Sequence, residues 1–279
     1  MVRKEGLVSV IIPCYNHGEF LEEAIDSILS QTYRDFEIIV VDDGSDNATT
    51  LALLKNLQKP KTTVYRKKNG GASSARNYGI EKSSGNYILT LDSDDRFAPS
   101  FLEKAVAILN QNPKAGMVTS WVKRFSETET SYARLEGGGI EDFIIRNHAS
   151  ASLLFRHSCW LDAGGYDEEI PGYEDWDFFI GVTKCGWRVE SIPEYLFYYR
   201  LLEGSNYDQH LKISPDIIKY MAKKHKKVFQ EYVVEVLYNK ELVLNEFRNS
   251  LNTYKSSASL KIGNLILMPY RTLRNFRKN

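Results

Sequence analysis

The chain lacks a long hydrophobic run, a net charge and a cysteine framework. No stretch reaches the about 18 consecutive apolar residues that span a bilayer, and lysine plus arginine equal aspartate plus glutamate at 36 each. This balance gives no indication of a nucleic-acid partner. Cys14, Cys159 and Cys185 are odd in number and far apart, which favours a reducing compartment. The apolar run 7–14 has no cleavage site, so we interpret it as a strand and expect a cytoplasmic protein.

Common phosphate-binding signatures are missing as well. The chain contains neither a GxxxxGK[ST] loop nor a GxGxxG sequence, which disfavours ATPases and dinucleotide-dependent enzymes. What is present is an ordinary globular composition, with 43% hydrophobic and 26% charged residues, and this argues against a disordered chain. A chain of this length has room for one large domain and a smaller appendage.

Strand-like and helix-like segments alternate along the first part of the chain. Continuous apolar runs predict strands at 8–12, 36–41, 63–65, 87–91 and 116–121. Amphipathic spacing predicts helices over 21–29, 48–57 and 101–109, with a further helix from about residue 72. This alternation indicates an α/β domain with a parallel sheet. A long helical region is expected over about 215–250.

Polar clusters follow three of these strands directly, at 13–16, 42–45 and 92–95. In an open α/β sheet, ligands bind outside the carboxyl ends of the strands, so three clusters at one edge predict a binding site. Taken alone, Asp42-Asp43-Gly44-Ser45 is best explained as a turn. The cluster Asp92-Ser93-Asp94-Asp95 fits either a solvated acidic turn or a site for a divalent cation such as Mn²⁺ or Mg²⁺, which prefers oxygen ligands.

Two more segments carry candidate chemistry. Residues 70–77 open a helix whose free N–H groups and dipole favour an anion, and Arg76 adds a positive charge there. Glu174 and Asp175 lie among aromatic residues, where desolvation raises the pKa of a carboxyl group toward that of a general base. The same acids could equally stabilise the start of a helix.

In their order along the chain, these motifs resemble the family 2 inverting glycosyltransferases with the GT-A fold. The resemblance covers about residues 7–206 and rests on the segments 8–16, 30–33, 40–45, 69–77, 92–95, 164–167 and 174–175. It implies a GT-A-like, mostly parallel central sheet with flanking helices, plus a C-terminal helical extension. It also implies a nucleotide-diphosphate sugar as donor, most often a UDP-sugar, and a role in bacterial surface glycans.

The resemblance further implies roles for individual residues. The donor nucleotide would be bound by Pro13, Tyr15, Asp42, Asp43, Arg76 and Asp92. Asp94 would be the main ligand of the metal ion, Mn²⁺ or Mg²⁺, with Asp95 beside it, and Asp175 the catalytic base. Candidates for the acceptor site or for a segment that closes over the donor are Gly165, Tyr166, Glu174, Trp176 and Arg200. The closing segment would also include Gly204 and Ser205.

On this basis we divide the chain into a glycosyltransferase domain, 1–210, and a helical extension, 211–279. The domain consists of a nucleotide-binding half, 1–120, and an acceptor-binding half, 121–210. The Gln-x-x-Arg-Trp signature of processive synthases is absent, so a single sugar transfer to a glycan or lipid-linked acceptor is expected. Two rival functions stay open: a nucleotidyltransferase that makes sugar nucleotides, and a non-catalytic nucleotide- or glycan-binding module.

The end of the chain is basic and amphipathic. Residues 255–279 contain six basic side chains and no acidic one, interleaved with apolar residues. This pattern suits the anionic inner face of the cytoplasmic membrane. It is equally explained by a tail that packs on the domain or forms a dimer contact, and the oligomeric state stays open.

Overall fold

The computed structural model describes residues 3–170, 172–202 and 206–257, and for 206–214 it describes the backbone alone. The predicted closing residues Gly204 and Ser205, and the tail from 258 onward, lie outside the described residues. The chain divides into two units, Met1–Gln230 and Glu231–Asn279. The first unit contains the sheet and the candidate site.

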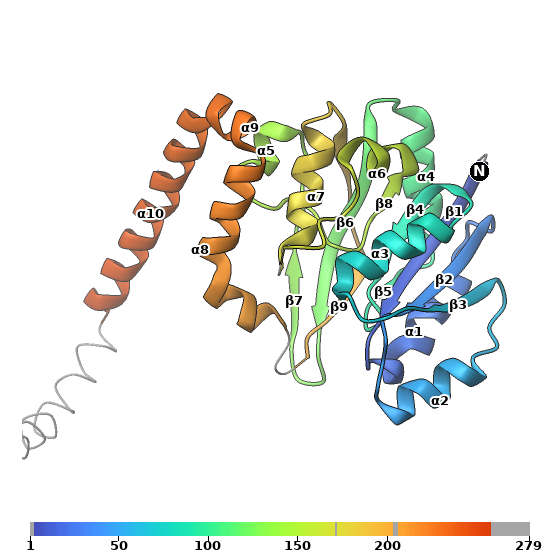
Figure 1. Cartoon of the computed structure of the whole chain (residues 1–279). Helices are drawn as coiled ribbons and strands as arrows, with labels where there is room; N and C mark the ends of the chain where they lie inside the picture. Colours follow the sequence, from blue (N-terminus) through green and yellow to red (C-terminus); the bar gives the residue numbers. More distant parts are fainter. Residues whose placement is uncertain (1–2, 171, 203–205, 258–279) are drawn as a thin grey trace, which may run out of the picture. The chain divides into compact units, whose positions relative to one another are not determined.

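A mostly parallel, nine-stranded sheet forms the centre of the described part of the first unit (Figure 1). In order across the sheet, its strands are β3 (Thr62–Arg66), β2 (Phe36–Asp42), β1 (Lys4–Cys14), β4 (Gly85–Thr90), β8 (Leu154–Arg156), β6 (Ala115–Phe125), β9 (Arg188–Arg200) and β5 (Arg96–Phe97), and β7 (Thr130–Ala133) pairs with β6. The strands β3, β2, β1 and β4 are mutually parallel, as are β6 and β9. The short strands β5, β7 and β8 are antiparallel to their neighbours. The predicted α/β fold class is confirmed.

Helices cover both faces of this sheet. Those of the first unit are α1 (Gly18–Leu29), α2 (Ala48–Asn56), α3 (Gly71–Lys82), α4 (Phe101–Gln111), α5 (Ile140–Phe143), α6 (His157–Ala163), α7 (Glu174–Thr183), α8 (Asn206–Lys224) and α9 (Lys226–Glu231). The second unit contributes α10 (Val233–Ser256). No helix in the described part of the chain is both long enough and apolar enough to cross a bilayer.

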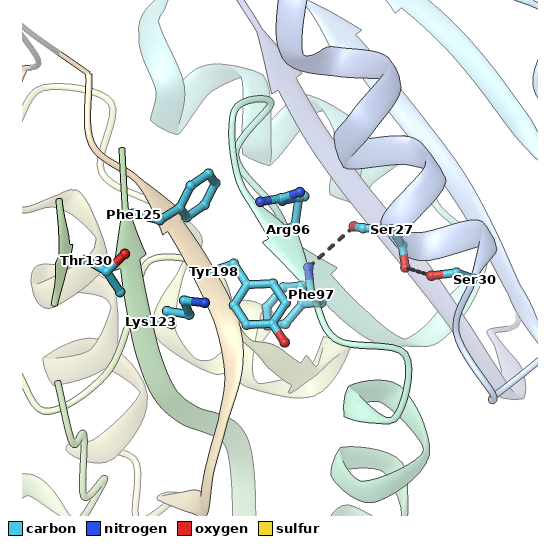
Figure 2. Close-up of a pocket in the computed structure, with 8 residues that line it drawn as sticks. All are labelled: Ser27, Ser30, Arg96, Phe97, Lys123, Phe125, Thr130 and Tyr198. Atoms are coloured by element: carbon cyan, nitrogen blue, oxygen red, sulfur yellow. Dashed lines mark hydrogen bonds between the residues drawn. The ribbon is translucent and has the colours of Figure 1, made fainter. Parts of the chain in front are cut away.

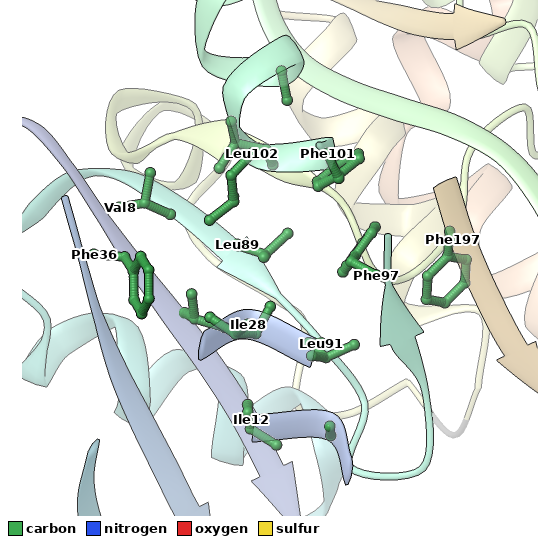
Figure 3. Close-up of a cluster of buried hydrophobic side chains, with 14 of the residues drawn as sticks. Val8, Ile12, Ile28, Phe36, Leu89, Leu91, Phe97, Phe101, Leu102 and Phe197 are labelled. Atoms are coloured by element: carbon green, nitrogen blue, oxygen red, sulfur yellow. The ribbon is translucent and has the colours of Figure 1, made fainter. Parts of the chain in front are cut away.

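Alternate residues of β1 point to opposite faces of the sheet and belong to different core clusters. Val10 packs with buried residues of α1 and α4, and Figure 3 shows this cluster around Ile28 and Phe101. Ile11 packs on the other face with residues of α3 and α7, among them Phe178. Because both faces are covered, β1 is a continuous apolar run rather than an alternating one. The two flanking layers fix α1, α3 and α7 around the carboxyl ends of the parallel strands.

Candidate active site

The acidic turn begins two residues after β4, at Asp92. The backbone N–H of Asp95 donates to the carbonyl of Asp92 at 3.1 Å and closes the turn. The carboxyl of Asp94 is half-buried, and this burial, together with the nearby Asp92 carboxylate, raises its pKa. Asp95 is buried, and burial beside Asp94 and Asp92 raises its pKa well above the usual value.

Arg200, the last residue of β9, holds this turn from one side. Its backbone N–H donates to Asp95 Oδ1 at 2.8 Å, and its Nε donates to the carbonyl of Asp94 at 2.9 Å. Its Nη2 pairs with Glu23 on α1, and the guanidinium lies over the rings of Phe20 and Phe125. Arg200 therefore fixes the position of the turn relative to α1 and β6.

Arg76 links the acidic turn to the start of α7. The side chain is only 3% exposed. Its Nη2 donates to Asp92 Oδ1 at 2.7 Å, and its Nη1 donates to Glu174 Oε1 at 2.8 Å. These two carboxylates outweigh desolvation and raise the pKa of Arg76. Its Nε has no hydrogen-bond partner among the described residues. Three predicted site residues are thus in direct contact.

Asp175 lies at the first turn of α7, next to this bridge. Its Oδ2 accepts from the Asn147 amide at 3.0 Å, and its Oδ1 accepts from the backbone N–H of Trp176 at 2.8 Å. Burial, and then the charge of Glu174, raise the pKa of Asp175 to about 6. Tyr173, the residue before α7, has a φ of 58°, a left-handed conformation that is rare for a bulky residue and concentrates at functional sites. The carboxyl group is therefore held in place and ready to exchange a proton near neutral pH.

The carboxylate of Asp43 occupies the start of α3. Its oxygens accept from the backbone N–H groups of Gly70 and Gly71, the latter at 2.7 Å, and from Lys67 Nζ at 2.8 Å. An anion was expected at this helix start, and the structure supplies it from the chain itself. Asp42 is also buried and accepts from the backbone N–H of Ser45 at 2.8 Å.

Pro13 and Tyr15 flank the end of β1, beside the loop that follows β2. Pro13 pairs with Val41 across the sheet, and the Tyr15 side chain is 46% exposed. Asn16, with a φ of 61°, accepts from the backbone N–H groups of Asp46 and Asn47 and so joins the two loops. The exposed Tyr15 ring is thus available to a ligand at this edge.

The remaining candidates differ in what they present to this site. Tyr166 is buried, stacks on Phe178 and lies 5.6 Å from the Arg76 guanidinium. Gly165 precedes it with a φ of 82°, which favours glycine there. Trp176 donates its indole N–H to the carbonyl of Phe143 at 2.6 Å. The indole N–H of Trp176 therefore stabilises the packing of α7 against α5.

The acidic turn offers oxygen atoms that suit a divalent cation. No ion pair to Asp94 occurs within the described residues, and the buried Oδ2 of Asp95 has no hydrogen-bond partner in the same part of the chain. Among residues 3–170, 172–202 and 206–257, however, no group of three His, Cys, Asp or Glu side chains is arranged to hold a metal ion. The turn fits a cation that takes one or two carboxylates and completes its shell with substrate phosphates and water.

An open hollow of about 480 Å³ lies beside Arg200, on the side of α1 and the β6–β7 hairpin. Figure 2 shows Arg96 between Phe125 and Ser27, and Lys123 and Tyr198 also line the hollow. The Arg96 guanidinium lies 6.0 Å from the centre of the Tyr198 ring. Arg96 pairs with the same Glu23 as Arg200, and both guanidinium groups lie over the Phe125 ring, at 4.5 and 4.7 Å. A ligand in this hollow would contact Arg96 and Phe125, which neighbour Arg200, the residue that holds the acidic turn.

The sequence analysis missed several residues that position these groups. Asn147 donates to Asp175 but lies between α5 and β8, where no periodic pattern identified it. Glu23 has the spacing of any solvent-facing acid on α1, yet it pairs with Arg200, 177 positions away. Lys67 follows β3, and no sequence pattern indicated that it pairs with Asp43.

Comparisons with known proteins show the family and the fold of this chain. Residues 9–160 match the model of the family described as glycosyl transferase family 2. The chain is 30% identical over 230 residues to an uncharacterized glycosyltransferase of Methanocaldococcus jannaschii, covering 78% of this chain and 79% of that protein. It is 30% identical to the uncharacterized glycosyltransferase EpsJ of Bacillus subtilis, covering 78% and 67% of the two chains.

Other relatives are much longer than this chain. An uncharacterized glycosyltransferase of Rickettsia bellii is 40% identical over 197 residues, and these cover 67% of this chain but 28% of that protein. The whole activity of such longer proteins is therefore no guide to this chain.

Solved structures show the same fold at low sequence identity. The mannosyltransferase PcManGT from Pyrobaculum calidifontis, in complex with GDP-Man and Mn²⁺, matches with a TM-score of 0.65 and 20% identity over 95% of this chain and 82% of that chain. S. aureus TarS 1–349 in complex with UDP matches with a TM-score of 0.61 and 22% identity, covering 77% of this chain and 64% of that chain. The fold is therefore the GT-A type.

Proposed function

Because this chain belongs to glycosyl transferase family 2, we propose that this glycosyltransferase moves one sugar from a nucleotide-diphosphate sugar to an acceptor hydroxyl, with inversion at the anomeric carbon. One observation carries the proposal. Arg76 contacts both Asp92 of the acidic turn and Glu174, so that the proposed metal ligands and the proposed base Asp175 belong to one site.

The donor site would lie at the carboxyl ends of β1, β2 and β4. Tyr15 presents an exposed ring there, Pro13 and Asp42 lie at the ends of β1 and β2, and Asp43 follows β2 directly. We propose a UDP-sugar as donor, with Arg76 facing the nucleotide and Asp92 the ribose or the sugar. TarS has been crystallised with UDP and UDP-GlcNAc, and PcManGT with GDP-Man, which supports a nucleotide-sugar donor here.

A divalent cation, Mn²⁺ or Mg²⁺, would be held by Asp94 and by the open oxygen of Asp95. When bound, it would neutralise charge on the leaving diphosphate as a Lewis acid. The half-buried position of Asp94 and the unpartnered Oδ2 of Asp95 support this assignment. Arg200 would keep both carboxylates in place through its contacts with the turn.

Asp175 would act as the general base. Its carboxylate takes the proton of the acceptor hydroxyl while the acceptor oxygen attacks the anomeric carbon. The bond from that carbon to the diphosphate oxygen breaks with its electron pair on the diphosphate, and in-line attack inverts the configuration. The position of Asp175 beside Asn147, and its pKa of about 6, support this role, since a base functions best with a pKa near the working pH.

We propose that the distal part of the acceptor binds in the hollow beside Phe125. The aromatic rings, hydroxyl groups and cationic groups that line this hollow are of the kinds that contact sugars. We further propose a glycan or lipid-linked glycan as acceptor and a role in bacterial surface polysaccharide synthesis. The enzyme would then work in the cytoplasm, at the inner face of the cytoplasmic membrane. The basic tail that would contact this membrane lies mostly outside the described residues.

The test is release of nucleoside diphosphate from UDP-, GDP- and dTDP-sugars with Mn²⁺ and a panel of glycan acceptors. Wild-type protein should release it, Asp175→Asn should not, and Asp35→Asn, an exposed change outside the site, should behave like wild type. Release of pyrophosphate from a nucleoside triphosphate plus a sugar phosphate would instead indicate a nucleotidyltransferase. Donor binding without turnover in the wild type would indicate a non-catalytic module.

A further inference from the structure

The helix α10 has an apolar surface that nothing in the described part of the second unit covers. None of its 24 residues is buried, and its large apolar side chains are exposed, with Leu237 at 61% and Phe247 at 66%. Isolated exposed leucines are ordinary, but a continuous exposed apolar surface of this length indicates a partner.

Six of the ten exposed apolar side chains of α10, together with Lys240, follow the spacing of a coiled coil, and the other four lie outside this seam, at Val234, Tyr238, Leu242 and Val243. Intervals of three and four residues connect Val233, Leu237, Lys240, Leu244, Phe247, Leu251 and Tyr254. Positions at such intervals form one seam along a helix, and they are the a and d positions of a heptad repeat. Lys240 interrupts the seam once, and a single polar residue in such a seam fixes the register of pairing.

The charges of α10 favour a protein partner over an anionic lipid surface. Its acidic residues Glu235, Glu241 and Glu246 balance the basic Lys240, Arg248 and Lys255. A surface helix that binds anionic lipids instead carries an excess of lysine and arginine on its polar face. The partner should therefore be another apolar helix.

The residues that flank the seam identify the partner as a second copy of the same helix. Glu241 and Arg248 both take the e position, which borders the seam. In an antiparallel pair of identical helices, in which Leu244 meets Phe247 across the seam, Glu241 of each helix lies opposite Arg248 of the other. A parallel pair would instead bring Glu241 and Arg248 opposite Val236 and Val243, with no charge pair. We propose that α10 pairs with α10 of a second copy of this chain as an antiparallel two-helix coiled coil, and that the protein is a dimer.

Sedimentation equilibrium of the full chain tests this pairing. Glu241→Arg and Arg248→Glu should each weaken the dimer by about tenfold or more, because each variant alone places like charges opposite one another. Mixed one to one, the two variants should recover the dimer, because every facing pair is then opposite in charge. Within each variant helix, residues 241 and 248 still carry like charges, so recovery cannot come from the intrahelical Glu241–Arg248 pair.

Glu235→Arg is the matched control, since it makes the same charge change on the same helix at an f position, away from the seam. It should leave the dimer unchanged. A monomeric wild-type chain would overturn the proposal, and so would a dimer that both single variants leave intact. Wild-type chain that stays monomeric but binds vesicles of phosphatidylglycerol and phosphatidylcholine would assign the surface to a membrane instead. Circular dichroism of each variant confirms that the helix still forms.

Discussion

The Nη2 atom of Arg76 lies 2.7 Å from Oδ1 of Asp92, and this ion pair joins α3 to the acidic turn after β4. The same guanidinium reaches Glu174 at the start of α7, so one buried cation connects the two halves of the candidate site.

Replacing Arg76 should therefore damage both stability and activity. Arg76→Met removes the cation that pairs with Asp92 and Glu174, and losing one member of a buried ion pair costs about 3–5 kcal/mol. Because the two carboxylates are 30% and 19% exposed, we expect a smaller loss of about 2–3 kcal/mol in urea unfolding. Arg188→Met, which breaks an exposed pair with Glu141, should cost less than about 1 kcal/mol. Equal losses in the two variants would contradict the bridging role.

The rate of transfer should depend on pH through Asp175. Its pKa is about 6, and only the ionised carboxylate can accept a proton. The rate should therefore rise about tenfold per pH unit below this value and level off above it. Asn147 donates to the charged form, so Asn147→Ala should move this rise to higher pH by about one unit or less. A pH–rate profile of kcat for both proteins measures the shift, and an unmoved profile would remove Asn147 from the site.

Asp175 should also lower the stability of the folded protein at neutral pH. Burial raises its pKa above the unfolded value of 3.8, so the unfolded chain releases this proton at lower pH than the folded one. Stability is then fully present below the unfolded pKa and decreases as the pH rises to about 6. Asp175→Asn should thus be more stable than wild type at pH 7, by about 1–2 kcal/mol, and similar at about pH 4. Thermal unfolding at the two pH values tests this, and a variant less stable at both would refute it.

The two carboxylates of the acidic turn should respond differently to substitution. Asp94 has no ion pair among the described residues, so Asp94→Ala should abolish Mn²⁺-dependent stabilisation by UDP with little loss of intrinsic stability. Asp95 accepts from the backbone of Arg200, so Asp95→Ala should lower the melting temperature even without ligand. A thermal-shift assay with UDP, with and without Mn²⁺, separates the two effects, and EDTA should make wild type resemble Asp94→Ala. If Asp94→Ala keeps a wild-type response to Mn²⁺, the proposed metal ligand is wrong.

The strands of the parallel half could be predicted because each is a continuous apolar run that can be recognised from its own residues. The apolar run of β1 is buried on both faces, and the polar residues after β1, β2 and β4 follow from strand ends alone. By contrast, β8 spans only Leu154–Arg156, too short to show a period, and its antiparallel pairing depends on long-range packing.

The sequence identified candidate residues for the site, but it did not predict which residues they pair with. Asp43 has the sequence context of a ligand-binding acid, yet its oxygens bind the start of α3. Whether Asp43 or a ligand occupies the start of α3 depends on how close the end of β2 lies to that helix. This distance is set by the packing of the whole sheet and cannot be predicted from the local sequence. Likewise, the pairing of Glu23 with Arg200 arises only when β9 lies against the acidic turn.

The helices after residue 210 should be necessary for the first unit to fold. Asp177, two residues after Asp175 on α7, is buried and accepts from Lys224 Nζ at 2.6 Å, while His225 Nε2 lies 2.8 Å from its other oxygen. A chain cut after residue 210 would remove both partners of this carboxylate together with the buried Ile217 and Met221, at a cost of about 3–5 kcal/mol or more. A chain cut after residue 230 keeps both partners and ends where the first unit ends.

We therefore expect residues 1–230 to unfold cooperatively and residues 1–210 to be unfolded or strongly destabilised, as measured by urea denaturation. Asp177→Leu in the 1–230 fragment separates the loss of the ion pairs of Asp177 from the loss of the rest of residues 211–230. Replacing the buried carboxylate with an apolar residue removes the need for a counter-charge, but it leaves His225 without its carboxylate and Lys224 with Asp167 as its remaining ion-pair partner. This variant should lie between the two fragments in stability. If 1–210 proves as stable as 1–230, the domain ends near residue 210 and the contacts of Asp177 contribute little.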